Sequence, residues 1–435
     1  MKKNMVNIVK QKKLFNSSET IIVALSGGVD SMVLFDIIHY INRNIVIAHV
    51  NHNKREESIK EYEYLKEFAK THNLPFEGYT IEKELKDNFH NESRKLRYKF
   101  FRGIAQKYKS NKIAVAHHLD DQVETILMRI VRGTSFSGYS GIKETRSDRN
   151  LSIIRPLMDF AKKDILEYAT NYNIKYFEDS SNIEDIYTRN RFRNNIIPLL
   201  KAENPNLDKK IVQFSEYIEG ADIVLEELKD AFLKEYCMYS TVSLAAFNKL
   251  NMVVKIKVLQ HLVNLASQDS VEVSFDQYKK MIEICFSETS NQQYSLSKNF
   301  EFRKEYEVIF VEKLEEVKPI NIKILKVGEY FVSDTKSYVI STHKLEHNNS
   351  NYYELCYNKL VFPLYIRNRQ NGDKIRLKIG TKKVKDILID QKIPPSKRDR
   401  LLVLANDDEV LWIPGIKKGY QEQIDEKKLY VYEVE

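Results

Sequence analysis

The feature that most constrains this chain is the loop Ser26-Gly27-Gly28-Val29-Asp30-Ser31, which separates an apolar run at 21–25 from a helical pattern beginning at 32. A buried strand that turns through paired glycines into a helix presents backbone amides at the positive end of that helix. Glycine lets the backbone approach an anion closely and adopt left-handed angles. The loop is therefore predicted to cradle phosphate, with Ser26 and Ser31 as hydroxyl donors and Asp30 as a candidate carboxylate for Mg²⁺.

The loop also has a plain alternative, a strand-to-helix turn with a serine cap. Its string does not fit the P-loop, which requires Gly-Lys-Ser/Thr, or the dinucleotide-binding fingerprint. It resembles the Ser-Gly-Gly-x-Asp-Ser signature of the PP-loop, or N-type, ATP pyrophosphatases. That resemblance implies cleavage of ATP between its α and β phosphates and transfer of AMP to an oxygen. It also implies the ATP-binding residues, which are Ser26, Gly27, Gly28, Val29, Asp30 and Ser31.

Composition describes an ordinary globular protein with more than one core. The chain has 435 residues, of which 43% are hydrophobic and 30% charged, so two or three domains are expected. Its three cysteines form no Cys-x-x-Cys pair, which argues against a disulfide scaffold or a zinc ribbon and fits a reducing compartment. No apolar run reaches the ~20 residues of a membrane helix, so a cytoplasmic location is expected.

Strand and helix patterns alternate through the first two hundred residues. Apolar runs at 45–50 and 113–116 are each preceded by a helical pattern, which predicts parallel strands joined by right-handed crossovers. The expected fold of this part is α/β with a parallel sheet. Ligands of such sheets bind at the carboxyl ends of the strands, where the Ser26–Ser31 loop lies.

An acidic segment, His117-His118-Leu119-Asp120-Asp121-Gln122-Val123-Glu124-Thr125, follows the strand at 113–116. One interpretation is a helix cap, because Asp121 with Glu124 three residues later is nearly a capping box. A second is a metal site made from histidines and carboxylates. A third follows from its position at the same sheet edge as the loop: Asp121 and Glu124 share a helix face and could hold a cationic amine.

Arginines recur in two later patterns. Arg97 lies on a helical pattern with an apolar face, where a surface salt bridge is the plain interpretation. The segment Thr188-Arg189-Asn190-Arg191-Phe192-Arg193 alternates arginine with polar and aromatic residues. Such alternation suits contact with phosphates or bases, although an exposed helix start has the same pattern.

These motifs occur in a fixed order over about two hundred residues: the loop, His-Val-Asn-His, His-His-Leu-Asp-Asp-Gln-Val-Glu-Thr, Arg-Pro-Leu, Glu-Asp-x-Ser-Asn and Arg-Asn-Arg-x-Arg. The set resembles the tRNA(Ile)-lysidine synthetases. The resemblance implies an enzyme that uses ATP and Mg²⁺ to adenylate the C2 oxygen of the wobble cytidine in a tRNA(Ile) with a CAU anticodon. The side-chain amine of free lysine then displaces AMP, which gives lysidine.

The same resemblance implies roles for individual residues. Asp121 and Glu124 are expected to bind lysine, and Asp30 to bind Mg²⁺. The expected catalytic residues are Asp30, Asp121, Glu124, Arg97 and His117. The expected tRNA contacts in this part of the chain are Asn182, Arg189, Arg191 and Arg193.

Three domains are expected: a PP-loop catalytic domain at 1–205, a helical middle domain at 206–317 and a mainly β tRNA-binding domain at 318–435. Between 361 and 400 there are twelve Lys or Arg against four Asp, a local excess that equals the net charge of +8 of the whole chain. A basic field of this kind favours a polyanion. The predicted tRNA contacts here are Arg367, Arg369, Lys382, Lys383 and Lys385.

Two other functions share some of these features. Another PP-loop enzyme such as a tRNA thiolase needs catalytic or cluster-binding cysteines in the crevice, and residues 1–200 contain no cysteine. A non-catalytic tRNA-binding protein keeps the basic stretch but does not need Asp30, Asp121 and Glu124 near the loop. The distance between these carboxylates and the loop therefore discriminates between an enzyme and a binding protein.

Overall fold

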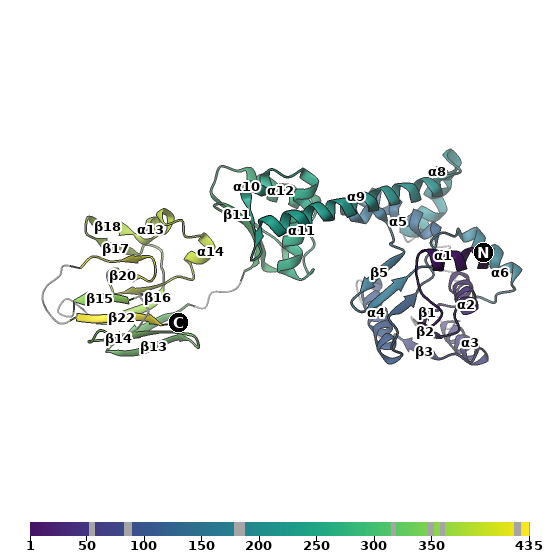
Figure 1. Cartoon of the computed structure of the whole chain (residues 1–435), viewed down its shortest axis with the longest axis horizontal. Coiled ribbons are helices and arrows are strands. Elements are labelled where there is room, and N and C mark those ends of the chain that lie inside the picture. The colour runs from purple at the N-terminus through teal and green to yellow at the C-terminus, as the bar shows by residue number, and fades with distance from the viewer. Residues whose placement is uncertain are drawn as a thin grey trace. The chain divides into compact units, whose positions relative to one another are not determined.

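The computed structural model describes residues 1–51, 57–81, 89–177, 188–314, 319–345, 352–356, 362–421 and 428–434. The chain divides into two compact units, residues 1–224 and 225–435 (Figure 1). Among the helices in these described ranges, none combines the length and the apolar character needed to cross a membrane.

The first unit is built on a six-stranded sheet in the order β3-β2-β1-β4-β6-β5. All neighbours pair in parallel except β5 and β6, so the predicted parallel α/β fold is confirmed. Strand order reverses between β1 and β4, and ligand sites of open α/β sheets lie at such a switch point. The strands are β1 (Ile21–Ala24), β2 (Ile45–Asn51), β3 (Phe76–Thr80), β4 (Lys112–Ala114), β5 (Thr145–Asp148) and β6 (Leu151–Ile154).

Helices cover both faces of this sheet because its strands are apolar on both sides. Ile21 and Val23 pack with α1, α2, α3 and α6, whereas Ile22 packs with α4 on the opposite face. The helices are α1 (Lys2–Gln11), α2 (Val29–Ile41), α3 (Glu57–Thr71), α4 (Phe89–Lys107), α5 (Leu119–Arg132), α6 (Lys162–Asn171), α7 (Thr188–Arg191), α8 (Ile197–Glu203) and α9 (Leu207–Tyr236), with a 3₁₀ turn η1 (Phe136–Ser140) and a π-helical turn η3 (Phe192–Ile196).

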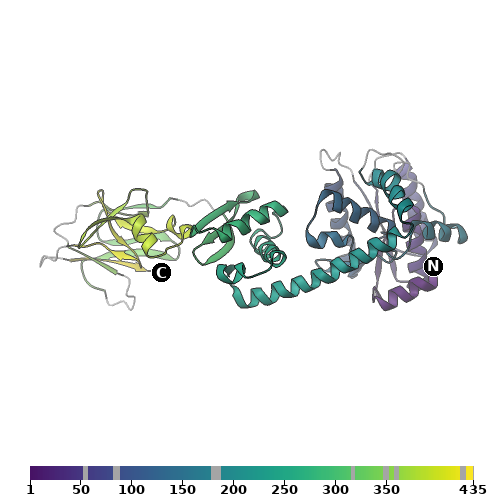
Figure 2. The same cartoon turned by 90° about the horizontal axis from the view of Figure 1, so that it is seen from above.

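The second unit begins with a helical region that also contains a five-stranded antiparallel sheet, β7-β8-β11-β10-β9. Helix α11 packs on β10 and β11, and α12 packs on β9 and β10 (Figure 2). The sequence predicts the helices but not this sheet. Its elements are β7 (Cys237–Met238), β8 (Thr241–Ser243), α10 (Leu244–Asn248), α11 (Met252–Ser267), α12 (Phe275–Phe286), β9 (Asn291–Ser295), the 3₁₀ turn η4 (Ser297–Asn299), β10 (Phe300–Glu305) and β11 (Val308–Lys313).

The rest of the second unit is mainly β, as predicted. One sheet has the order β12-β16-β19-β20-β17-β18 with β21 beside β20, and a second has the order β13-β14-β22-β15. Trp412 and Tyr338 are fully buried in the core that joins the two sheets. The elements are β12 (Asn321–Ile324), β13 (Gly328–Ser333), β14 (Lys336–Ser341), β15 (Tyr352–Cys356), β16 (Leu364–Asn368), β17 (Lys374–Leu377), β18 (Gly380–Lys383), α13 (Val384–Asp390), α14 (Pro395–Arg398), β19 (Leu402–Ala405), β20 (Val410–Ile413), β21 (Lys417–Lys418) and β22 (Lys428–Val434). The division into three domains at 205 and 317 stays a prediction.

Candidate active site

The Ser26–Ser31 loop joins β1 to α2 at the switch point of the sheet. Gly27 has φ +90°, and a Cβ there would lie 3.4 Å from a ring carbon of Phe177, so position 27 favours glycine on conformational grounds. The Ser31 hydroxyl donates to the Gly28 carbonyl (2.9 Å) and accepts from the Ser26 amide (3.1 Å). The two predicted serines thus fix the shape of the turn.

His49 supports the loop from the neighbouring strand β2. Its Nδ1 lies 2.7 Å from the carbonyl oxygen of Leu25, and because that oxygen can only accept, Nδ1 carries the proton. Burial lowers the pKa of His49, and the hydrogen bond to Leu25 opposes this effect only in part. His49 is therefore a neutral residue that supports the loop.

Asp30 lies in the first turn of α2 and points toward the start of α6. Its two carboxylate oxygens accept from the ammonium of Lys162 at 2.6 and 2.8 Å. The backbone amide of Lys162 donates to Asp120 in the first turn of α5 (2.7 Å). Lys162 therefore links the loop to the acidic segment, although sequence reasoning did not single it out.

His118 lies between the loop and the acidic segment. It is 4% exposed, and its Nε2 is 3.9 Å from Asp30 Oδ1 and 3.6 Å from Asp121 Oδ2. Burial alone would lower the pKa of His118, but Asp120, whose Oδ2 lies 3.5 Å from Nδ1, and the charges of Asp121 and Asp30 outweigh it and raise the pKa. For Asp120, burial alone would raise the pKa, but the contacts with His118 and Lys162 lower it to about 2. Asp30 and Asp121 are thus held against one imidazole.

Asp121 caps α5, but not as the predicted N-cap with Glu124 as its partner: His118 is the N-cap, the helix begins at Leu119, and Asp121 is its third residue. Its Oδ2 accepts the backbone amide of His118 at 2.9 Å, at the N-terminus of α5. Its other oxygen, Oδ1, accepts from Arg189 at 2.7 Å. The cap and a side-chain site therefore share one carboxylate.

Glu124 is the most deeply buried carboxylate of the segment, with 1% exposure. It accepts from Arg189 Nε at 2.6 Å and from Arg193 at 2.6 and 3.1 Å. The residues predicted to hold lysine and two of those predicted to contact tRNA thus form one cluster. Arg191, on the exposed side of the same segment, bonds to Thr188 instead (3.1 Å). Asn182 lies outside the described residues.

His117 and Arg97 lie at the border of the cluster. Arg155, 4% exposed, donates from Nε to His117 Nδ1 at 3.2 Å, so Nδ1 of His117 is unprotonated. Burial lowers the pKa of His117 to about 4; the charge of Asp121 opposes this, whereas those of Arg155, Arg189 and Arg97 lower it further. His117 is consequently a neutral acceptor at pH 7. Arg97 on α4 is near enough for its charge to act on this histidine.

In the second unit, the predicted tRNA contacts fall into two groups. Arg367 forms a two-point ion pair with Asp373 (2.9 and 3.0 Å), and Arg369 pairs with Asp399 (2.6 Å). By contrast, three lysines on β18 and at the start of α13 are exposed: Lys382, Lys383 and Lys385. Lys382 contacts Asp390.

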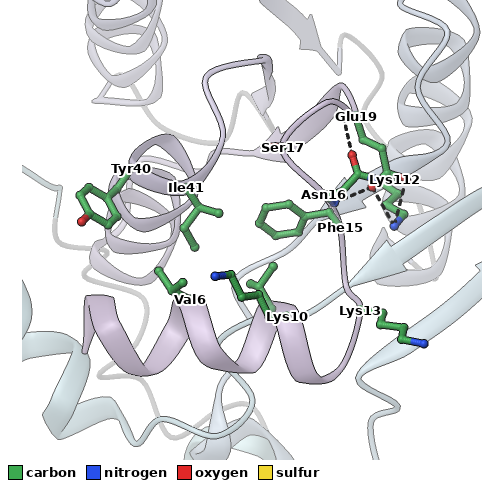
Figure 3. Close-up of a pocket in the computed structure, with 11 residues that line it drawn as sticks. Val6, Lys10, Lys13, Phe15, Asn16, Ser17, Glu19, Tyr40, Ile41 and Lys112 are labelled. Carbon is green, nitrogen blue, oxygen red and sulfur yellow. Dashed lines mark hydrogen bonds and ion pairs between the residues drawn. The ribbon is translucent and has the colours of Figure 1, made fainter.

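A cavity of about 890 Å³ lies at the opposite ends of the strands from the loop, between α1, the end of α2 and the segment before β1 (Figure 3). Its lining includes Phe15, Tyr40 and Lys112 but no predicted site residue. Lys112 is tied there to Glu19 and the Leu14 carbonyl. The convergence of titratable groups, rather than cavity size, marks the candidate site.

Within the described residues, no three His, Cys, Asp or Glu side chains are grouped to hold a metal ion by themselves.

Comparison with known proteins gives two family matches. Residues 1–200 match the PP-loop domain, and residues 364–432 match the TilS substrate C-terminal domain. The chain is 32% identical to the tRNA(Ile)-lysidine synthase of Bacillus subtilis over 97% of this chain and 95% of that protein. It is 32% identical to the bifunctional protein TilS/HprT of Listeria innocua over 99% of this chain and 70% of that protein. A U34-tRNA thiolase, NcsA from Methanococcus maripaludis, matches 50% of this chain and 78% of its own with a TM-score of 0.43 and 16% identity.

Proposed function

The chain belongs to the tRNA(Ile)-lysidine synthase family and is an ATP-dependent ligase that forms lysidine in tRNA; we propose how its residues divide the two chemical steps. The observation that carries the proposal is the position of His118, whose ring touches both Asp30 beside the loop and Asp121 in the acidic segment. The carboxylates are gathered at the loop, which favours an enzyme over a tRNA-binding protein.

In the first step, the C2 oxygen of the wobble cytidine attacks the α phosphorus of ATP. The bond from that phosphorus to the bridging oxygen breaks, and pyrophosphate leaves with the electron pair. The Ser26–Ser31 loop holds the phosphates at the N-terminus of α2, where backbone amides stabilise negative charge. Only this step gives C2 of the cytidine a leaving group, AMP, because cytidine alone has no departing group at C2.

Mg²⁺ fits this loop through Asp30. Magnesium on nucleotide phosphates takes one or two protein carboxylates, and Asp30 offers hard oxygen donors at the start of α2. Both oxygens now accept from Lys162, so the metal would share this carboxylate with the ammonium. When bound, Mg²⁺ supplies neutralising charge on the phosphates.

In the second step, the uncharged side-chain amine of lysine attacks C2, the bond from C2 to the adenylated oxygen breaks, and AMP leaves while the amine loses a proton. Asp121 and Glu124 hold and orient lysine. Arg189 and Arg193 fix the directions of these carboxylates and limit their net charge. Arg97 and His117 lie beside them as further contacts for the substrate.

The proposed tRNA contacts are the exposed lysines of the β18 region in the second unit and Arg191 of the α7–η3 segment in the first unit. The alternative function, a tRNA thiolase, would need reactive cysteines. Burial instead raises the pKa of Cys285 to about 12, so Cys285 stays an unreactive thiol. Cys237 also has a raised pKa because of burial. Both lie outside the PP-loop match.

The test is incubation of the protein with ATP, labelled lysine and a tRNA with a CAU anticodon. We expect label to enter the tRNA and to survive mild base, which strips aminoacyl esters. Asp30→Ala should abolish pyrophosphate release, whereas Glu124→Gln should retain some adenylation but lose lysine transfer. A lack of stable label with the unaltered protein refutes the function. A Glu124→Gln variant that is only less stable to heat would leave Glu124 a structural role.

A further inference from the structure

Lys162 stands at the meeting point of three helix N-termini. It is the first residue of α6, its ammonium contacts Asp30 in the first turn of α2, and its amide contacts Asp120 in the first turn of α5. Helix N-termini carry partial positive charge, and together they favour an anion. The side chain is 37% exposed, so its ammonium is held at the loop without being enclosed.

The position of Lys162 is not explained by helix stability. A cation at the first position of a helix opposes the helix dipole and costs roughly 0.3–1 kcal/mol at an exposed site. Nor is Lys162 needed to hold α2 and α6 together, because Tyr168 of α6 also donates to Asp36 of α2 at 2.6 Å and Ile165 packs in their shared core. The lysine is therefore placed against local preference at the edge of the phosphate loop.

We propose that Lys162 is a further catalytic residue of the adenylation step, an inference that rests on the proposed function. Its ammonium contacts the ATP phosphates beside the loop and neutralises the charge that develops on pyrophosphate as the bond to the α phosphorus breaks. An ammonium has three donors on a flexible stem, so it can keep one on Asp30 and aim the others at phosphate oxygens. Asp30 thus orients Lys162 as well as offering an oxygen to the metal.

The experiment compares Lys162→Met with Lys163→Met, a matched change of the exposed neighbouring lysine on the same helix. Three quantities are measured: equilibrium binding of radiolabelled ATP without tRNA, pyrophosphate release in a single turnover with tRNA, and the Tm. We expect Lys162→Met to weaken ATP binding about tenfold and to slow pyrophosphate release about 100-fold, in the range of other lost transition-state donors. Lys162→Arg, which keeps the charge, should recover part of both, and Lys163→Met should match the unaltered protein.

Two results overturn the inference. One is a lowered Tm for both Lys162→Met and Lys162→Gln, with unchanged ATP affinity and an unchanged rate of pyrophosphate release at a temperature well below that Tm. Lys162 would then only hold the two helices together. The other is an equal loss of ATP affinity and of pyrophosphate release in Lys163→Met, because the effect would then come from the positive charge of α6 in general and not from a contact of Lys162. If the unaltered protein incorporates no lysine, the proposed function fails. If the unaltered protein incorporates lysine and Lys162→Met has the same ATP affinity and the same rate of pyrophosphate release, only this inference fails.

Discussion

The two basic regions of this chain differ in what their positive charges contact. In the α7–η3 segment, Arg189 and Arg193 are about two-fifths exposed and both are bonded to the buried Glu124. In the second unit, β18 and the start of α13 present lysines on an exposed surface, and Lys383 lies directly opposite Lys374 of β17. Like charges opposite each other destabilise a strand pair, so this hairpin maintains its charge at a cost.

The difference teaches that a basic motif is not the same as free positive charge. Arginine has a planar fork that matches a carboxylate at two points, which suits it to fixed ion pairs inside a protein. Arg367, which sits in the basic stretch but is paired with Asp373, follows this behaviour. Lysine is a flexible point charge that more readily remains available to a polyanion. We therefore expect arginine and lysine variants to fail in different ways.

The largest effect is expected for Arg193→Met. It leaves the buried Glu124 with a single arginine, and breaking a buried ion pair costs about 3 kcal/mol or more. We expect the free energy of unfolding of the first unit to fall by that amount, and lysine incorporation to fall at least 100-fold. Arg191→Met, a matched change on the exposed side, should be stable. If Arg193→Met changed only tRNA affinity, with no loss of stability, the two regions would be alike.

Arg367→Met tests the same distinction inside the second unit. Asp373 is 9% exposed and loses both of its contacts with this guanidinium, so we expect a loss of about 2–3 kcal/mol in chemical denaturation. Arg369→Met should cost less, about 1 kcal/mol or below, because its partner Asp399 is 74% exposed. Unchanged unfolding of Arg367→Met, together with weaker tRNA binding, would return Arg367 to the group of tRNA contacts.

The burial of His117, to which the nearby arginines add, should also appear in the pH dependence of the stability of the first unit. The pKa of His117 is lowered to about 4 from an ordinary value of 6.5, so between these values the unfolded chain binds a proton that the folded chain does not. Stability from this source is complete above pH 6.5 and is lost as the pH falls toward 4. Between pH 7 and pH 4.5, we expect the free energy of unfolding to fall by on the order of 2 kcal/mol less in His117→Gln than in the unaltered protein, as measured by chemical denaturation at both pH values. Equal pH dependence in both proteins would contradict a neutral His117.

The sequence predicts those parts of the site that are local in the chain. Ser26 to Ser31 and the shared face of Asp121 and Glu124 follow from spacing within one turn or one helix, whereas the predicted cap was three residues out of register, because the N-cap is His118. The parallel order of strands follows from alternation of strand and helix patterns. These features depend on neighbours in sequence, which is why they can be read without a structure.

Pairings over long distances could not be predicted in the same way. Glu124 and Arg193 are 69 residues apart, and Asp30 and Lys162 are 132 apart, so no periodicity connects them. The sheet beside α11 was missed for another reason. Its strand β9 (Asn291–Ser295) has a largely polar sequence without apolar alternation, and it is specified by pairing with β10 rather than by its own pattern.

The smallest effect is expected for the exposed lysines of the β18 region, where the one ion pair, between Lys382 and Asp390, is itself exposed. Replacement of Lys382, Lys383 and Lys385 by Gln removes exposed charge, so we expect an unchanged Tm and ATP affinity but about tenfold weaker tRNA binding, or ~1.4 kcal/mol. Each lost phosphate contact should reduce the slope of log affinity against log salt by about 0.7–0.9, so the slope should fall by about 2–3 in total. The control is an equal change of exposed lysines elsewhere in the same unit, Lys249, Lys280 and Lys313. Equal losses for the two triple variants would mean that net charge, rather than the β18 surface, attracts tRNA, and the contrast between exposed lysines and buried, paired arginines would no longer explain where tRNA binds.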